Sequence, residues 1–65
     1  RGLKLSFEER MEMQRLLRRK GFGIEKIDGI VGPNTVRAIR AFQATAGVAQ
    51  DGLPSQQVLA LLRRS

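Results

Sequence analysis

The side chains between residues 28 and 40 have types and spacings that could do chemistry, and that chemistry is the binding of carboxylates. Arg37 and Arg40 are three residues apart, so on a helix their guanidinium groups would share one face. A guanidinium group binds a carboxylate through two parallel hydrogen bonds, and the backbone amides at a helix start attract the same group. Gly29 and Gly32 would present further loop amides just before that helix. The pattern predicts a site for an acidic ligand.

The polar residues of this stretch also have structural uses. Asp28 is a lone carboxylate in a Gly-containing turn, where such a residue more often accepts hydrogen bonds from loop amides than contacts a ligand. Asn34 and Thr35 are typical helix-start residues. The candidate binding residues form one set between positions 28 and 40. They are Asp28, Gly29, Ile30, Gly32, Asn34, Thr35, Arg37 and Arg40.

The composition argues against catalysis and against a bound metal. The 65 residues include no Cys and no His, which removes the usual zinc ligands. Glycan cleavage by two carboxylates needs a cleft between them, and a chain of this size leaves little room for one. Most of its acidic residues have helix-start or turn explanations. We therefore expect no catalytic residue, no metal and no cofactor.

Charge favours anionic partners without choosing among them. Twelve Lys and Arg against six Asp and Glu give a net charge of +6, which suits nucleic acid, anionic lipid or an acidic polymer. Part of this charge lies in basic runs at 18–20 and 63–64. Cations in the last turn of a helix complement its dipole, so a helix-end role is favoured over a dedicated binding patch.

Three helices must position these residues. Ser6 and Glu9 form a capping-box pattern, which predicts a helix from Phe7 to Lys20 that ends at Gly21. A second helix is predicted over 33–46 and a third over 54–63, each preceded by a Gly-rich loop. The inward side chains of the first helix are expected to be Met13, Leu16 and Leu17, with Phe7 over one end. Those of the other two are expected to be Val36, Ile39, Phe42 and Ala46, and Val58, Leu61 and Leu62.

The loops that precede the second and third helices carry two copies of one motif. Asp28-Gly29-Ile30-Val31-Gly32-Pro33 recurs in a shortened form as Asp51-Gly52-Leu53-Pro54, and a helical apolar stripe follows each copy. Ile24, Ile27 and Ile30 are expected to anchor the first loop to the core, with Phe22 and Phe42 also packed inward. The prediction is an all-α fold: a small three-helix bundle with an imperfect internal duplication.

The central motif resembles a known family. Residues 27–43, Ile-Asp-Gly-Ile-Val-Gly-Pro-Asn-Thr-Val-Arg-Ala-Ile-Arg-Ala-Phe-Gln, are similar to the signature of the peptidoglycan-binding domain, a three-helix cell-wall module. Met13-Gln14-Arg15-Leu16-Leu17 and Gly21-Phe22 resemble its first helix and its stop. The Ile-Asp-Gly centre with Gly-Leu-Pro-Ser further on is most similar to the C-terminal domain of membrane-bound lytic murein transglycosylases. Arg10 and Lys20 stand where the family more often has apolar residues, and we expect their charged heads to reach water.

The resemblance implies a function. It implies one peptidoglycan-binding domain over residues 1–65, excised from a longer protein, that tethers a murein hydrolase or lytic transglycosylase without catalysing the reaction. The implied location is periplasmic or extracellular, against the cell wall, as a monomer without membrane insertion. Three Phe with no Trp or Tyr leave few rings for stacking on sugars, so stem-peptide carboxylates are favoured over glycan.

Two other functions stay open from the sequence. A basic three-helix domain could bind DNA by offering Asn34, Thr35, Arg37 and Arg40 to a major groove. The loop before the second helix is longer than the usual turn of such domains, so no nucleic-acid partner is expected. A protein-docking module is the other alternative, and it rests on fold alone.

Overall fold

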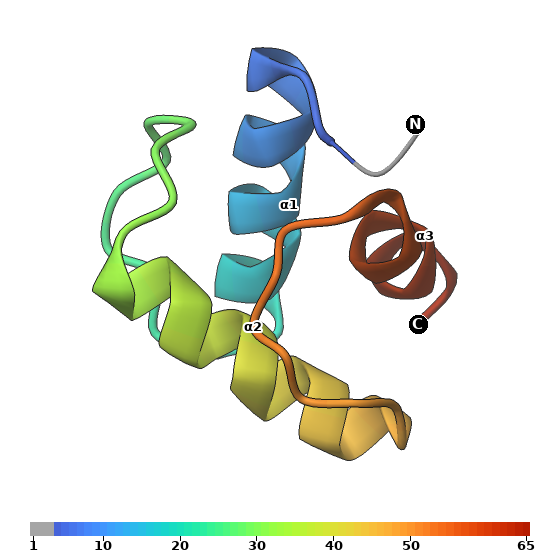
Figure 1. Cartoon of the computed structure of the whole chain (residues 1–65). Coiled ribbons are helices and arrows are strands. Elements are labelled where there is room, and N and C mark those ends of the chain that lie inside the picture. The colour runs from blue at the N-terminus through green and yellow to red at the C-terminus, as the bar shows by residue number, and fades with distance from the viewer. Residues whose placement is uncertain (1–3) are drawn as a thin grey trace.

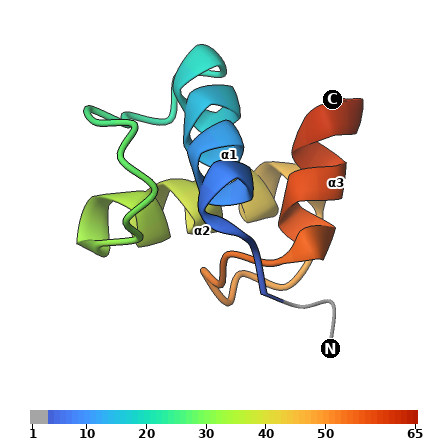
Figure 2. The same ribbon diagram turned by 90° about the horizontal axis from the view of Figure 1, so that it is seen from above.

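The structure, a computed structural model, describes residues 4–65 and confirms the all-α prediction. Its helices are α1 (Phe7–Arg19), α2 (Pro33–Ala46) and α3 (Gln56–Arg64), and no strand occurs in this part of the chain. The first three residues of the predicted 1–65 domain lie outside the described residues. α2 crosses one end of α1, and α3 packs beside α1 (Figure 1). The loop after α1 projects on one side of the molecule and the loop after α2 on another (Figures 1 and 2).

α1 begins at Phe7 as predicted and ends at Arg19, one residue before the predicted Lys20, which is its C-cap. Ser6 Oγ accepts a hydrogen bond from the Glu9 amide at 3.1 Å, and Glu9 Oε1 accepts one from the Ser6 amide at 2.8 Å. This reciprocal pair is the predicted capping box. At the other end Gly21 has a φ of +87°, a left-handed conformation that Gly adopts without strain. The helix leads directly from this stop into the first loop.

α2 has the predicted bounds, but its buried face is rotated from the prediction. Ile39 and Phe42 are buried as expected, whereas Ala46 is exposed and Val36 is only partly buried. Thr35, Ala38 and Gln43 are buried instead. The two polar residues among them are buried because each finds a hydrogen-bond partner, which removes the usual cost of burying a polar group.

α3 begins two residues later than predicted. Ser55, and not Pro54, starts the helix, because Ser55 Oγ caps it by accepting from the Val58 amide at 3.2 Å. Val58 and Leu62 are buried and Leu61 is partly buried, as expected, but Leu59 is also fully buried. Pro54 therefore fixes the backbone just before the cap.

The core lies among the three helices. It is formed by Leu5, Met13, Leu17, Ile24, Ala38, Ile39, Phe42, Val58, Leu59 and Leu62, with Leu16, Phe22 and Ile27 packed against it. The Phe22 ring meets the Phe42 ring edge-on at 6.0 Å. Of the three predicted loop anchors, Ile24 and Ile27 pack inward. The prediction for Ile30 is wrong, because 67% of its surface is exposed.

Candidate functional site

One buried glutamine of α1 holds the first loop in place. Gln14 Oε1 accepts hydrogen bonds from the amides of Asp28 at 3.1 Å and Gly29 at 2.8 Å. Its Nε2 donates to Asp28 Oδ1, to the Ile30 carbonyl and to Thr35 Oγ1, at 3.3, 3.0 and 3.3 Å. Gln14 itself is 1% exposed. A single side chain thus joins α1, the turn and the first turn of α2.

Asp28 takes the structural role that the sequence favoured. Its Oδ1 accepts from the Ile30 amide at 2.9 Å, which closes the turn around Gly29. The backbone amides of Asp28, Gly29 and Ile30 therefore all donate hydrogen bonds to side chains of the protein itself. The expectation that Gly29 and Ile30 offer backbone donors to a ligand is corrected accordingly.

The start of α2 has unused hydrogen-bonding capacity. Gly32 is the N-cap residue in an extended conformation, Pro33 follows as the first helical residue, and no side chain among residues 4–65 caps the helix. Asn34 and Thr35 lie in the first turn of α2, as predicted, but neither caps it, because Asn34 Oδ1 accepts from Arg37 Nη2 and Thr35 Oγ1 accepts from Gln14. Helix N-termini carry a partial positive charge that favours anions.

This helix start opens onto a hollow of about 320 Å³. Its wall contains five of the predicted binding residues and five others. The lining residues are Gln14, Ile24, Glu25, Lys26, Asp28, Ile30, Gly32, Pro33, Asn34 and Thr35. We call this the α2 hollow. It combines one basic side chain, two carboxylates, the uncapped helix start and the exposed Ile30, so it presents both charges beside an apolar surface.

Three predicted binding residues lie outside the α2 hollow. Arg37 is exposed at its edge, where it donates to Asn34. Arg40 lies against the second loop, with its Nε 3.0 Å from the place that a Cβ on Gly52 would take. Gly29 is covered by Phe7. Neither guanidinium group of the predicted pair lines the α2 hollow.

Arg10 has a role that the sequence did not suggest. Its Nε donates to the Gly29 carbonyl at 2.6 Å and its Nη1 to the Leu5 carbonyl at 2.8 Å. The expectation that its head reaches water is wrong, because two backbone carbonyls bind it. The buried side of α1 includes Arg10, Gln14 and Leu17 at helical spacing. Two polar residues on this side were the sequence signal that Arg10 and Gln14 bind the first loop.

The basic runs meet at the ends of α1 and α3. Arg19, Lys20 and Arg63 line a separate hollow of about 360 Å³ there. Arg63 forms a two-bond pair with Glu12, with both distances at 2.8 Å. The Glu12 carboxylate raises the pKa of Arg63, and Arg63 lowers that of Glu12. This arrangement joins the two helices at the surface.

Backbone hydrogen bonds lower the pKa of both turn aspartates. The Ile30 amide is the main cause for Asp28, and the Leu53 amide is the main cause for Asp51. Each amide stabilises the ionised carboxylate that accepts its hydrogen bond. Both groups are therefore ionised at neutral pH, and acid should weaken both turns.

Acidification is expected to destabilise the domain through these turns. A carboxylate whose pKa is lower in the folded than in the unfolded state contributes stability above the unfolded value, and this is lost as the pH falls through the folded value. The thermal unfolding midpoint should be constant from pH 7 to about 5 and fall below about pH 4. In the Asp28→Asn, Asp51→Asn double variant the fall should be smaller. Equal falls in both proteins would contradict this assignment.

Residues 7–62 match the family described as "Putative peptidoglycan binding domain". The chain belongs to this family. Two solved structures of SltB3 from Pseudomonas aeruginosa are similar to it, one in complex with NAG-anhNAM-pentapeptide and the other with NAG-NAM-pentapeptide. Each is 43% identical over 92% of this chain, with a TM-score of 0.88. The chain spans 16% of the length of SltB3. A comparison with curated proteins found no match.

Two further observations bear on the function of this family member. Thr35 is buried, so three of the four residues considered for a DNA groove, Asn34, Arg37 and Arg40, are exposed on α2. In residues 4–65 no helix is long and apolar enough to cross a membrane. The α2 hollow brings together five of the eight predicted binding residues.

Proposed function

We propose that this chain is a non-catalytic cell-wall module that binds peptidoglycan and holds an attached murein hydrolase or lytic transglycosylase to its substrate. Membership of the peptidoglycan-binding family supports the binding role. The match to 16% of the SltB3 chain supports a module within a larger protein. Tethering raises the effective concentration of an enzyme at its substrate, so weak binding by the module suffices. The proposed location is the periplasm or the exterior, at the wall.

The α2 hollow is the proposed binding site, and its uncapped helix start is the observation that carries this proposal. The free amides and Lys26 suit a carboxylate, while Glu25 and Asp28 suit an amino group. A stem peptide carries both kinds of group, whereas the sugars of the glycan are mostly neutral. The exposed Ile30 side chain adds an apolar contact. We therefore propose that the stem peptide, and not the glycan, occupies the hollow.

Co-sedimentation with purified sacculi tests this function, and Gly32→Asp is the informative variant. Gly32 has an extended backbone and a Cβ there would meet nothing within 4 Å, so the fold should accept the change. The new carboxylate would cap α2 and take up its free amides. We expect unchanged or slightly higher stability and binding weakened about fivefold or more, since an internal anion replaces the ligand.

Ala49→Asp is the matched control. It adds the same charge in the exposed part of the second loop, outside the α2 hollow. If Ala49→Asp weakens retention as much as Gly32→Asp, general charge and not the α2 hollow governs binding. A duplex DNA mobility shift at the same salt concentration is the second arm, and DNA binding without sacculus binding would reject the proposal.

A further inference from the structure

The hydrogen bonds of the first turn recur in the second loop. Gln43 is 2% exposed and binds the second turn as Gln14 binds the first. Its Oε1 accepts from the Gly52 amide at 2.9 Å and its Nε2 donates to Asp51 Oδ1 at 2.8 Å. Asp51 Oδ1 also accepts from the Leu53 amide at 3.0 Å, as Asp28 does from Ile30. Both turns are therefore built on a buried glutamine and an aspartate.

The two turns also lead into their helices with the same register. The N-cap residues Gly32 and Ser55 each stand four positions after the turn aspartate, so the second copy is not shortened before its helix. The shortening predicted for the second copy therefore concerns only the interval from the aspartate to the proline, and not the interval from the aspartate to the N-cap. The structure pairs Ile30 with Leu53 and Gly32 with Ser55.

A second hollow, of about 370 Å³, lies at the second turn. It is lined by Lys4, Asp51, Leu53, Pro54, Ser55 and Gln57, and we call it the α3 hollow. Four of its positions have counterparts in the α2 hollow under the shared register. The counterpart pairs are Asp28 and Asp51, Ile30 and Leu53, Gly32 and Ser55, and Asn34 and Gln57. Each hollow also has one lysine, Lys26 or Lys4.

Both hollows expose an apolar side chain at the same position. Ile30 is 67% exposed and Leu53 is 58% exposed. Each turn uses only backbone atoms of this residue: the aspartate binds its amide in both turns, and Gln14 also binds the Ile30 carbonyl, so any residue would supply these atoms. Each of these side chains lines its hollow, so each is placed to contact a ligand there.

We propose that the α3 hollow is a second binding site for stem peptide, so that one domain binds two stems of the same wall polymer. This inference rests on the proposed function. Ser55 caps α3, so the α3 hollow has less attraction for an anion than the α2 hollow and is the weaker site. The two loops lie on different sides of the molecule, so each site takes a separate stem (Figures 1 and 2).

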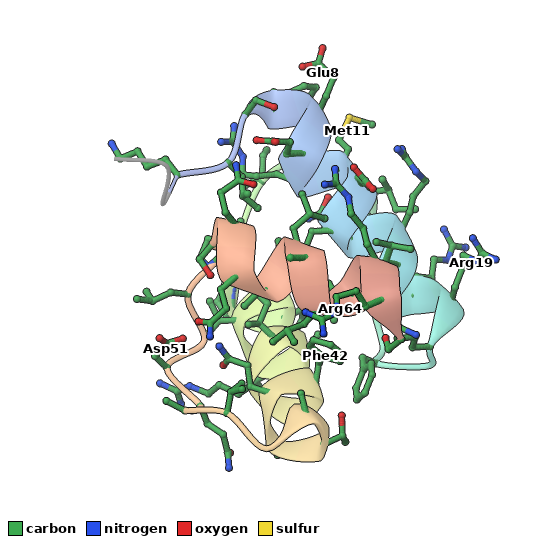
Figure 3. All side chains as sticks on the ribbon, turned by 90° about the vertical axis from the view of Figure 1, so that its right-hand side faces the viewer. Glu8, Met11, Arg19, Phe42, Asp51 and Arg64 are labelled. Carbon is green, nitrogen blue, oxygen red and sulfur yellow. The ribbon has the colours of Figure 1, made fainter. Side chains whose placement is uncertain are left out.

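A titration of the ¹⁵N-labelled chain with a soluble muropeptide, a disaccharide that carries one stem peptide, tests this proposal. We expect amide shifts around Ile30 at low ligand concentration and around Leu53 at several-fold higher concentration. Ile30→Ser should remove the first set and Leu53→Ser the second, and neither should unfold the chain, because both side chains are mainly exposed. Met11→Ser is the matched control, since Met11 points outward from α1 and lines neither hollow (Figure 3).

Sacculi supply the second readout, because linked sites reinforce one another on a polymer. Leu53→Ser should reduce retention on sacculi about tenfold or more and leave the muropeptide affinity near Ile30 unchanged. Shifts around Ile30 alone, with full retention of Leu53→Ser on sacculi, would overturn the second site and leave the proposed function intact. No shifts in either loop and no retention of the wild-type chain would overturn both.

Discussion

Replacing Gln14 by Leu is expected to lower the free energy of unfolding by about 3 to 5 kcal/mol. Leu fills a similar volume, but it leaves the buried Gly29 amide and Thr35 hydroxyl without the partner that Gln14 gives them. Each buried polar group without a partner costs about 1 to 3 kcal/mol. Since a domain of this size has small total stability, most of the variant should be unfolded at 37 °C. Urea unfolding followed by circular dichroism measures the change.

Gln50→Leu is the control for this substitution. Gln50 is exposed in the second loop, so the same chemical change there should alter stability by less than about 0.5 kcal/mol. Gln43→Leu should fall between the two variants, because Gln43 makes two of these bonds where Gln14 makes five. A Gln14→Leu protein as stable as Gln50→Leu would show that the glutamine does not hold the turn.

Gly29→Ala is expected to cost about 2 to 3 kcal/mol of stability, for two separate reasons. The φ of Gly29 is +75°, a conformation that side chains disfavour. A Cβ at this position would also lie 2.5 Å from Cε1 of the Phe7 ring, so the ring must move. The thermal unfolding midpoint should therefore drop by about 8 to 24 °C, as about 1 kcal/mol corresponds to 4–8 °C in small domains.

Gly23→Ala separates the two causes. Gly23 has a φ of +78° but nothing lies within 4 Å of its would-be Cβ, so this variant should show only the backbone cost, about 1 to 2 kcal/mol. In a Phe7→Ala background, Gly29→Ala should cost no more than Gly23→Ala. If Gly29→Ala keeps its full cost there, the Phe7 contact is not the second cause.

Local signals predicted the helix ends well. The capping box of Ser6 and Glu9, the stop at Gly21 and the start of α2 at Pro33 are each set by residues within a few positions, and the structure confirms them. The predicted start of α3 was two residues too early, because both Pro54 and Ser55 are typical of a helix start. The hydrogen bond from Val58 to Ser55 decides between them.

Polar residues at buried positions could not be predicted from local patterns. Gln14 and Gln43 are inward-facing because distant turns satisfy their amides, and the helix pattern alone favours apolar residues there. Arg10 finds its carbonyl partners only after the first loop folds back onto α1. Ile30 was expected in the core because of its apolar type, but the turn points it outward. The sequence therefore predicted which loop carries the candidate site, but only some of the residues that line it.

The most direct test of the central claim compares two ligands on the amides from Ile30 to Thr35. One is a muropeptide with its stem peptide, and the other is the same disaccharide without the stem, with the carboxyl group that carried the stem blocked as a methylamide. We expect the stem-bearing ligand to shift these amides and the stem-free sugar to leave them in place. Equal shifts with both ligands, or none with either, would contradict stem-peptide binding in the α2 hollow.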